Sequence, residues 1–420
     1  MKDGYKKTEL GWIPVDWAVK RLEEFSISSS YGPRFSAELY DENGNCRIIR
    51  GTDVIDNGKV CYEAIPYASI SNEVLEKHRL EENDFVVITT ADCGVSFVFD
   101  NSGVFMPSAY MVRIRFNDNI NPYYVNRFFN NKIIKSQVEK HIRKGTVANL
   151  PGSDLLKFKI CIPPLKEQEK IADILSTVDS QIDDTDKLIE KTKELKNGLM
   201  QRLLTKGIGH TDFKKTEVGE IPVEWQTKRL AEISDIKRGA SPRPIKDKKW
   251  FSEDKNIGWI RISDVTASSK YLFTTTQYLS DEGVKKSRLV KENDLIMSIC
   301  ATVGKPIILK MCACIHDGFI LLDKIDEKKY EKEFLYYVLQ KYESQFKSMG
   351  QTGTQANLNT SLVGDQIIAV PLLEEQKKIG SILSEVDMQI EEYENKKMKL
   401  EELKKGLMQQ LLTGKVRVKV

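Results

Sequence analysis

The sequence lacks several features that would assign it to a catalytic, secreted or membrane class. Its four histidines stand in no context with a serine or cysteine nucleophile. It contains no Gly-x-x-x-x-Gly-Lys or Gly-x-Gly-x-x-Gly segment to hold the phosphates of a nucleotide or dinucleotide. No apolar run is long enough to cross a membrane, and the N-terminus has no apolar stretch typical of a secretory signal. These absences predict a cytoplasmic protein that is not itself an enzyme.

Neither sign of charge is in clear excess, and cysteine is sparse. The chain has 64 Lys and Arg against 61 Asp and Glu, a net charge of +3, which neither requires nor excludes a nucleic-acid partner. Its seven cysteines include no CxxC pair, which favours free thiols. Cys312, Cys314 and His316 alternate along a predicted strand, so a zinc site is one interpretation. Because no fourth ligand is evident nearby, we favour buried strand thiols and predict no metal site.

What the sequence does have is a long internal repeat. Between residues 6–24 and 214–232, 13 of 19 positions are identical at an offset of 208. The same offset superposes Glu167-Gln168 on Glu375-Gln376. A unit of this size far exceeds the periods of about 20–50 residues found in solenoid proteins. The repeat therefore predicts a duplicated domain together with its connector.

Each half has a Gly-x-Ile-Pro-Val-x-Trp leading segment, a strand-rich region of similar length, and a segment with helical periodicity. The predicted parts are a first domain, a first helix, a second domain, a second helix and a tail, at residues 1–162, 163–207, 208–370, 371–414 and 415–420. Pro163-Pro164 and Pro371 precede the helices, and Gly207 and Gly414 follow them, as start and stop signals.

The two helical segments carry an apolar stripe at heptad spacing, as in a coiled-coil seam. At 1.5 Å per residue, each would be roughly 60 Å long. We expect the two stripes to pack against each other, with the alternative that each stripe covers its own domain. The residues of the seam are Ile171, Leu175, Val178, Ile182, Leu199, Leu203, Ile379, Leu383, Val386, Ile390, Leu407 and Leu411.

The strand-rich regions share a skeleton but differ between its fixed points. Arg50-Gly51-Thr52-Asp53 corresponds to Arg261-Ile262-Ser263-Asp264, and Glu82-Asn83-Asp84 corresponds to Glu292-Asn293-Asp294. Loops between these points are rich in Arg, Lys, Gln and Thr, the residue types that contact base edges and phosphates in DNA. The candidate DNA-binding residues are Tyr31, Arg34, Arg47, Arg50, Arg143, Lys144, Thr146, Lys237, Arg238, Ser241, Arg243, Lys246, Lys248, Lys249, Arg261, Gln351, Thr352, Thr354 and Gln355.

These motifs, duplicated in order along nearly the whole chain, resemble the specificity subunit of type I restriction-modification systems. In that family a helix opens with Pro-Pro-Leu-x-Glu-Gln-x-x-Ile, which matches residues 163–171. The second copy, residues 371–379, departs only in having Leu372 for the second proline. Ile-Leu-Ser-x-x-Asp-x-x-Ile and Gly-Leu-Met-Gln-x-Leu-Leu-Thr follow in both copies.

The resemblance implies an α+β fold, in which two mixed α/β target-recognition domains are joined by two long antiparallel coiled-coil helices with pseudo-two-fold symmetry. Each domain would read one half of a bipartite, asymmetric site in double-stranded DNA, and the helices would fix the spacing of the halves. Two methyltransferase subunits and two restriction-translocase subunits would assemble on this scaffold. The assembled complex would be an endonuclease and adenine methyltransferase, whose S-adenosylmethionine, ATP and Mg²⁺ belong to the partner subunits.

Two interpretations from other classes remain open. A coiled-coil scaffold whose variable regions bind proteins would show the same stripe, and the absence of neighbouring methyltransferase and helicase-nuclease genes would favour it. A solitary nicking or methylating enzyme is disfavoured by the missing cofactor motif, and an activity assay on the isolated chain would decide that question.

Overall fold

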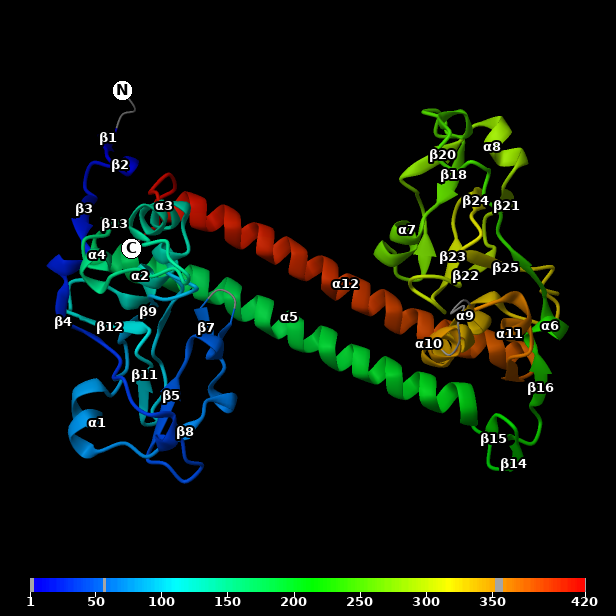
Figure 1. Ribbon diagram of the computed structural model, residues 1–420, viewed down its shortest axis with the longest axis horizontal. Helices are drawn as coiled ribbons and strands as arrows, with labels where there is room; N and C mark the ends of the chain where they lie inside the picture. The colour runs from blue at the N-terminus through cyan, green and yellow to red at the C-terminus, as the bar shows by residue number, and fades with distance from the viewer. Residues whose placement is uncertain (1–3, 56–57, 352–357, 420) are drawn as a thin grey trace. The chain divides into compact units, whose positions relative to one another are not determined.

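The computed structural model describes residues 4–55, 58–351 and 358–419, in which the chain forms two compact units. Unit 1 combines residues 1–186 with 395–420, and unit 2 comprises residues 187–394. Two long helices, α5 (Leu165–Lys206) and α12 (Leu373–Leu411), each contribute one segment to each unit. Figure 1 shows both helices and the strands of each unit. No helix in the described ranges is long and apolar enough to span a membrane.

Unit 1 is built around a four-stranded antiparallel sheet, with strand order β10-β9-β12-β4. A three-stranded sheet, order β11-β5-β8, packs beside it, and in this sheet β11 runs parallel to β5. The strands of the two sheets are β4 (Ser26–Tyr31), β5 (Cys46–Ile49), β8 (Tyr67–Ala68), β9 (Phe85–Ile88), β10 (Ser96–Val98), β11 (Phe105–Pro107) and β12 (Met111–Phe116). The remaining strands form pairs: β1 (Tyr5–Thr8) with β2 (Gly11–Pro14), β3 (Ala18–Arg21) with β13 (Lys159–Ile162), and β6 (Val54–Ile55) with β7 (Lys59–Val60).

Alternation along the strands of unit 1 sends side chains to two cores. Phe85 and Val87 of β9 pack with α2 (Pro122–Phe129) and α3 (Lys132–His141), whereas Val86 and Ile88 pack toward the smaller sheet. Both faces of β9 are therefore buried, which explains its continuous apolar run. The shorter helices of this unit are α1 (Asn72–His78) and α4 (Gly152–Leu155).

Unit 2 repeats this plan with additional strands. Its larger sheet has the order β17-β25-β22-β23-β19 and its smaller sheet has the order β20-β18-β24-β21. The strands are β17 (Asp235–Arg238), β18 (Ile257–Ile260), β19 (Tyr271–Leu272), β20 (Gln277–Leu279), β21 (Arg288–Val290), β22 (Leu295–Ser298), β23 (Pro306–Leu309), β24 (Ala313–Ile315) and β25 (Phe319–Asp323). The paired strands are β14 (Phe213–Thr216) with β15 (Gly219–Pro222) and β16 (Gln226–Arg229) with β26 (Ile367–Val370).

The helices of unit 2 are α6 (Leu230–Ile233), α7 (Ile262–Ala267), α8 (Asp281–Lys285), α9 (Lys332–Lys341), α10 (Glu343–Gln351) and α11 (Thr360–Gly364). Leu295 and Met297 of β22 share a core with α9, and Ile296 faces the smaller sheet. The predicted α+β architecture is therefore confirmed, and both units contain the same layers of helices, larger sheet and smaller sheet.

The repeated Glu-Asn-Asp segments form matching turns before β9 and β22. Asn83 and Asn293 adopt positive φ values of 71° and 66°, a conformation that asparagine tolerates better than most residues. The carboxylates of Asp84 and Asp294 each accept a hydrogen bond from the backbone N–H three residues earlier, at 2.8 Å in both units. The repeated Glu-Asn-Asp segment therefore forms the turn that precedes a buried strand in each unit.

The remaining repeated motifs tie each domain to the long helices. The indole N–H of Trp17 donates to the buried Glu167 at 3.1 Å, and that of Trp225 donates to Glu375 at 3.0 Å. The neighbouring Gln168 makes one bond on each side of its amide. It accepts from the backbone N–H of Asn121 at 2.9 Å and donates to the carbonyl of Pro163 at 3.0 Å.

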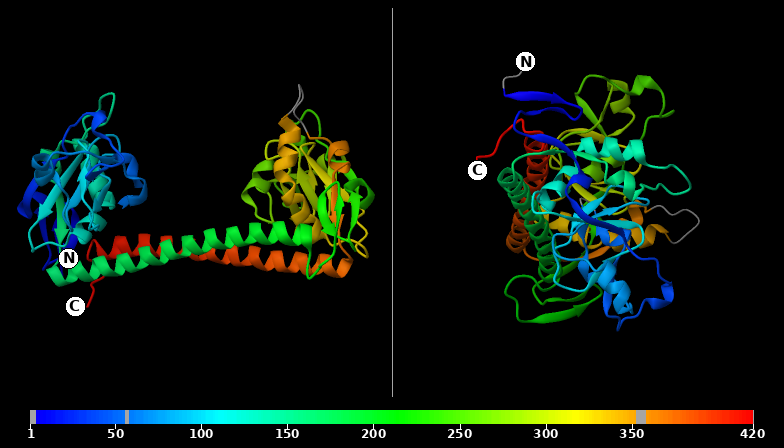
Figure 2. Two further views of the ribbon diagram at one scale, coloured as in Figure 1. Left: turned by 90° about the horizontal axis from the view of Figure 1, so that it is seen from below. Right: turned by 90° about the vertical axis from the view of Figure 1, so that its left-hand side faces the viewer.

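Within each unit the two helix segments lie side by side and antiparallel (Figures 1 and 2). In unit 1, Lys404 of α12 pairs with Asp179 of α5 at 2.6 Å. In unit 2, Lys196 of α5 pairs with Asp387 of α12 at 2.7 Å. Asp179 and Asp387 are the aspartates of the two Ile-Leu-Ser-x-x-Asp segments. They also contact the domains, through Arg127 in unit 1 and through the Tyr337 hydroxyl in unit 2.

Both interpretations of the apolar stripe hold in part. Val178, Val386 and Ile390 are buried along the helix pair. The ends of the stripe instead enter the domain cores. Unit 1 receives Ile171, Leu175 and Leu411, with Leu407 half-buried beside them, and unit 2 receives Leu203, Ile379 and Leu383, with Leu199 half-buried beside them. Ile182 is half-buried.

Two buried threonines fill positions of the α5 stripe at which the apolar pattern is interrupted. Thr185 and Thr192 are both buried on α5, and their hydroxyls donate to the carbonyls of Gln181 and Leu188, at 2.6 and 2.7 Å. A threonine can therefore be buried there without an unsatisfied hydroxyl. A search for apolar residues alone overlooks these two positions.

The prediction of a one-sided row of buried thiols at residues 312–316 is wrong in one respect. Cys314 is buried in β24, but Cys312 precedes the strand and is exposed. His316 follows the strand and leads into the turn before β25. The alternating pattern failed because the strand is only three residues long. All seven cysteines are free.

Candidate nucleic-acid interface

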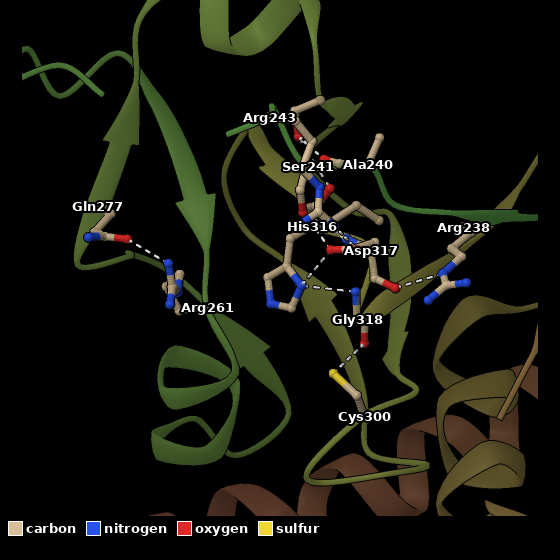
Figure 3. A network of polar contacts seen from close by, with 12 residues as sticks. Arg238, Ala240, Ser241, Arg243, Arg261, Gln277, Cys300, His316, Asp317 and Gly318 are labelled. Atoms are coloured by element: carbon tan, nitrogen blue, oxygen red, sulfur yellow. Dashed lines mark hydrogen bonds and ion pairs between the residues drawn. The ribbon is translucent and has the colours of Figure 1, made fainter. Parts of the chain in front are cut away.

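In unit 2 three of the predicted residues bond to one aspartate, Asp317 (Figure 3). Asp317, in the turn between β24 and β25, accepts a hydrogen bond from the Ser241 hydroxyl at 2.5 Å and from Arg243 Nη2 at 3.0 Å. Arg238, at the end of β17, donates from Nε to the backbone carbonyl of Asp317 at 2.8 Å. Burial raises the pKa of Asp317, but the bond from Ser241 and the charge of Arg243 outweigh that effect, and the pKa lies below its usual value. The carboxylate is thus ionised at neutral pH and holds Arg243 and Ser241 in place, whereas Arg238 is held by the backbone carbonyl of the same residue.

The histidine beside this carboxylate is held between aromatic rings. The His316 ring lies 5.8 Å from the Trp259 ring and 4.8 Å from the Phe319 ring, and its Nδ1 accepts from the Gly318 N–H at 2.9 Å. Burial lowers the pKa of His316, the charge of Arg261 lowers it further, and Asp317 opposes the shift. His316 is therefore a neutral, packed side chain at neutral pH, and the positive charge of the cluster resides on its arginines.

Arg261 stands at the end of β18, beside Gln277 of β20. Its Nη1 donates to Gln277 Oε1 at 3.1 Å, which leaves its other guanidinium donors available (Figure 3). Arg243 is 69% exposed at its side chain. Exposed arginines whose orientation is set by a neighbouring carboxylate or amide suit the bidentate recognition of base edges.

The predicted lysines of unit 2 do not bond to Asp317 or Gln277, and each is either paired with a nearby aspartate or exposed. Lys237 forms an ion pair with Asp323, and Lys249 pairs with Asp247 at 3.3 Å while lying 4.4 Å from the centre of the Trp250 ring. Lys246 and Lys248 are exposed. Long exposed ammonium groups of this kind suit phosphate contacts, which carry no sequence information.

In unit 1 the side chains of three predicted residues, Arg50, Arg47 and Tyr31, are bonded to other residues of the same unit. Arg50 donates from Nε and Nη2 to the carboxylate of Asp53, at 3.0 and 2.7 Å. Arg47 lies over the Tyr67 ring at 4.5 Å and donates to the Tyr67 hydroxyl at 2.5 Å. The hydroxyl of Tyr31 accepts from the backbone N–H of Gly152 at 2.6 Å. These residues therefore serve the packing of unit 1 as well as any contact with a ligand.

Other predicted residues of unit 1 are open to solvent. Arg34 is exposed in the segment after β4. Arg143 forms a backbone bridge with Asn149, so that the exposed Lys144 and Thr146 lie in the loop that this bridge closes. The corresponding loop of unit 2 contains Thr352, Thr354 and Gln355, which lie outside the described residues. Gln351 ends α10, and its side chain is likewise outside the described part.

Asp317 and Gln277 accept hydrogen bonds from predicted arginines, and Thr275 donates to Asp264, the aspartate three residues after Arg261. None of the three was predicted. Asp317 directly follows the short segment, residues 312–316, for which a metal site was one interpretation. The described residues include no group of three or more His, Cys, Asp or Glu suited to a metal ion. An alignment of the two halves of the chain would have shown polar residues at Gln277 and its neighbours where unit 1 has none. Thr275-Thr276-Gln277 of unit 2 stands where unit 1 has Ala64-Ile65-Pro66, by the pairing of β20 with β18 and of β8 with β5.

Unit 1 also has a cavity of about 990 Å³ between α2, α3, β7 and the helix pair. Seven lysines and arginines and four carboxylates line it. Arg127 and Lys404 are already paired with Asp179, and Lys59 with Asp183, whereas Ile182 and Met408 supply apolar surface. The cavity is thus a basic recess with an apolar wall.

Comparison with known proteins identifies the family. The family model described as the type I restriction modification DNA specificity domain matches the chain twice, at residues 14–194 and 222–402. The chain belongs to this family of type I restriction-modification specificity subunits. A specificity subunit is the non-catalytic, DNA-recognising component of such a system, so the prediction that the chain is not an enzyme is confirmed.

Relatives and solved structures extend over the whole chain. Two specificity subunits from Methanocaldococcus jannaschii, named for the type I restriction enzymes MjaX and MjaVIII, are 29% and 28% identical. They cover 100% and 97% of this chain, and the matches span 98% and 94% of their own lengths. The S subunit of the type I restriction-modification system from M. genitalium superposes with a TM-score of 0.61 at 16% identity, covering 94% of this chain and 96% of that one.

A second solved chain, from a structural study of complex assembly and conformational transition in a type I restriction-modification system, has a TM-score of 0.57 at 18% identity. It covers 96% of this chain and 99% of the other. At these identities the structural likeness supports the fold. The assignment of individual DNA-binding residues stays a prediction.

Proposed function

We propose that this specificity subunit reads a bipartite, asymmetric site in double-stranded DNA, one half with each unit. The observation that carries the proposal is the contrast between a repeated scaffold and different exposed clusters. Trp17–Glu167 and Trp225–Glu375 repeat the same domain-to-helix contact. The exposed clusters differ, because unit 2 gathers arginines around Asp317, whereas unit 1 stacks Arg47 on Tyr67. Two readers with different side chains should read different sequences.

We further propose that the long helices set the distance between the half-sites. Each helix is continuous, and α5 has 42 residues, a length of roughly 60 Å. Two domains that contact the same face of a duplex must be separated by about 34–36 Å or a multiple of that distance. A continuous helix supplies a stiff spacer of the required scale.

The same helices, in this proposal, dock two methyltransferase subunits, on which two restriction-translocase subunits then assemble. Leu188, Leu195, Met398 and Leu403 are exposed on α5 and α12, outside the buried seam. Neighbouring exposed apolar side chains, such as Leu188 and Leu195 seven residues apart on one face of α5, suit contact with a partner subunit. S-adenosylmethionine, ATP and Mg²⁺ would bind to those partner subunits, and the complex would act in the cytoplasm as endonuclease and adenine methyltransferase.

Methylated-base sequencing tests this function. A host carrying the chain with its neighbouring methyltransferase gene should show one methylated motif of two unlike parts separated by a fixed gap, and deletion of the chain should abolish it. A continuous or palindromic motif, or methylation that persists without the chain, would contradict the proposal.

A further inference from the structure

Arg50 and Arg261 occupy the same position in the two units and yet have different partners. Each directly follows an inner strand of the smaller sheet, β5 or β18, and begins an Arg-x-x-Asp segment. Each donates its backbone N–H to the aspartate, at 2.8 Å in unit 1 and 2.9 Å in unit 2. Beyond that shared bond the side chains diverge. Arg50 closes on Asp53 with two bonds, whereas Arg261 turns to Gln277.

The cause of this difference lies on the neighbouring strand. In unit 2 the buried carboxylate of Asp264 accepts from the hydroxyls of Thr275 and Thr276, at 2.7 and 2.9 Å. Unit 1 has Ala64 and Ile65 at these two positions, and neither side chain can donate a hydrogen bond. A buried carboxylate requires donors, so Asp53 takes them from its own arginine, whereas Asp264 is satisfied by the threonines and leaves Arg261 free.

The amide of Gln277 orients the guanidinium of Arg261. Its Oε1 accepts from Arg261 Nη1, which fixes the plane of the guanidinium and leaves Nε and Nη2 as a free pair of donors. Such a pair matches the N7 and O6 acceptors of guanine. The Gln277 NH2 group remains a donor, and since its oxygen is already engaged, the amide suits an acceptor such as guanine O6 or thymine O4 better than the donor–acceptor edge of adenine.

We propose that Arg261 and Gln277 act as one base-reading pair of unit 2, selecting a guanine and an acceptor on the adjacent base, and that the corresponding Arg50 of unit 1 does not read a base. This inference rests on the proposed DNA-reading function and goes beyond it by assigning the reader in one unit and excluding its counterpart in the other. Thr275 and Thr276 are positioning residues, because they act through Asp264.

The test compares variants of the full chain co-expressed with its methyltransferase partner, with the methylated motif as the readout. In Arg261→Ala, discrimination at one guanine of one half-site should fall by roughly 5- to 150-fold. Gln277→Ala should relax the same position or the adjacent one. Arg50→Lys, the matched control, keeps a charge that can pair with the buried Asp53 and should leave the motif unchanged, because Arg50 reads no base.

A fourth variant tests the cause without touching either reader. Thr275→Ala combined with Thr276→Ile gives unit 2 the residues of unit 1, so Asp264 should recapture Arg261 and the same guanine should become degenerate. If Arg261→Ala abolishes methylation altogether, Arg261→Lys decides. It retains the charge but not the bidentate geometry, and it should methylate a motif that is relaxed at that guanine.

An unchanged motif in Arg261→Ala or Arg261→Lys, or a motif relaxed by Arg50→Lys, would overturn the pairing. Failure of the broader function looks different. In that case the unmodified chain itself would give no two-part motif, whatever happens in the variants.

Discussion

Replacing Glu167 by glutamine should destabilise unit 1 more than any exposed charge change on the same helix. Glu167 is 1% exposed and accepts three hydrogen bonds, from Trp17 Nε1 at 3.1 Å and from Arg417 Nε and Nη2 at 2.7 and 2.8 Å. Glutamine keeps one acceptor oxygen and adds two donors that find no acceptor there. The buried indole N–H or the arginine must then lose its partner.

The magnitude follows from these contacts. Hydrogen bonds to a charged group contribute about 1.5–3 kcal/mol each. Arg417 is 41% exposed and keeps Asp16 at 2.7 Å, so water and Asp16 offset much of its loss. A net loss of about 2–3 kcal/mol results, which lowers the melting temperature of a unit of this size by about 4–12 °C.

The assay is thermal unfolding combined with hydrogen exchange. Glu169→Gln, an exposed change on the same helix, is the control and should shift the melting temperature by no more than about 1–2 °C. Faster exchange should be confined to the peptides around Trp17 and Arg417. Equal shifts for the two variants would refute the view that the repeated Glu-Gln segment ties the domain to the helices.

Two further predictions concern unit 2. Replacing both Arg243 and Lys246 by alanine should reduce the magnitude of the slope of log K for DNA binding against log salt concentration by about one to two, roughly 0.9 for each phosphate that is no longer neutralised. The control variant, Lys328→Ala, should leave the slope unchanged. An unchanged slope in the double variant would exclude Arg243 and Lys246 from the DNA interface. Because burial lowers the pKa of His316 below its ordinary 6.5, the unfolded chain binds more protons as the pH falls through that value, so unit 2 loses stability on acidification. Melting temperatures measured between pH 7.5 and 5.5 should therefore fall less steeply in His316→Phe, and parallel curves would show that His316 does not titrate on unfolding.

The long helices could be predicted because their pattern is local and sustained. A heptad stripe from Ile171 to Leu203 needs no knowledge of the partner helix, and the Asn83 and Asn293 turns follow from the conformational tolerance of one residue type. The stripe could not show that its ends are buried in the domain cores, because Leu175 and Leu411 meet only after the chain has folded across more than 200 residues.

The candidate site was less predictable because charge alone does not reveal a side chain's partner. Arg50-x-x-Asp53 and Arg261-x-x-Asp264 are the same pattern in the sequence. They differ because Thr275 and Thr276 come from a neighbouring strand. Arg243 likewise meets Asp317 across 74 positions of sequence. The sequence could therefore predict the residue types of the candidate interface, but it could not predict which arginines are free and which are paired with a carboxylate.

A domain exchange tests whether the repeated scaffold carries two independent readers. Residues 25–150 are replaced by the corresponding segment of another family member, leaving Trp17, Glu167 and both long helices intact, and the methylated motif of the host is sequenced. Independence of the two units predicts that one half of the motif changes while the other half and the gap between them stay the same. A motif altered in both halves, or in neither, would contradict it.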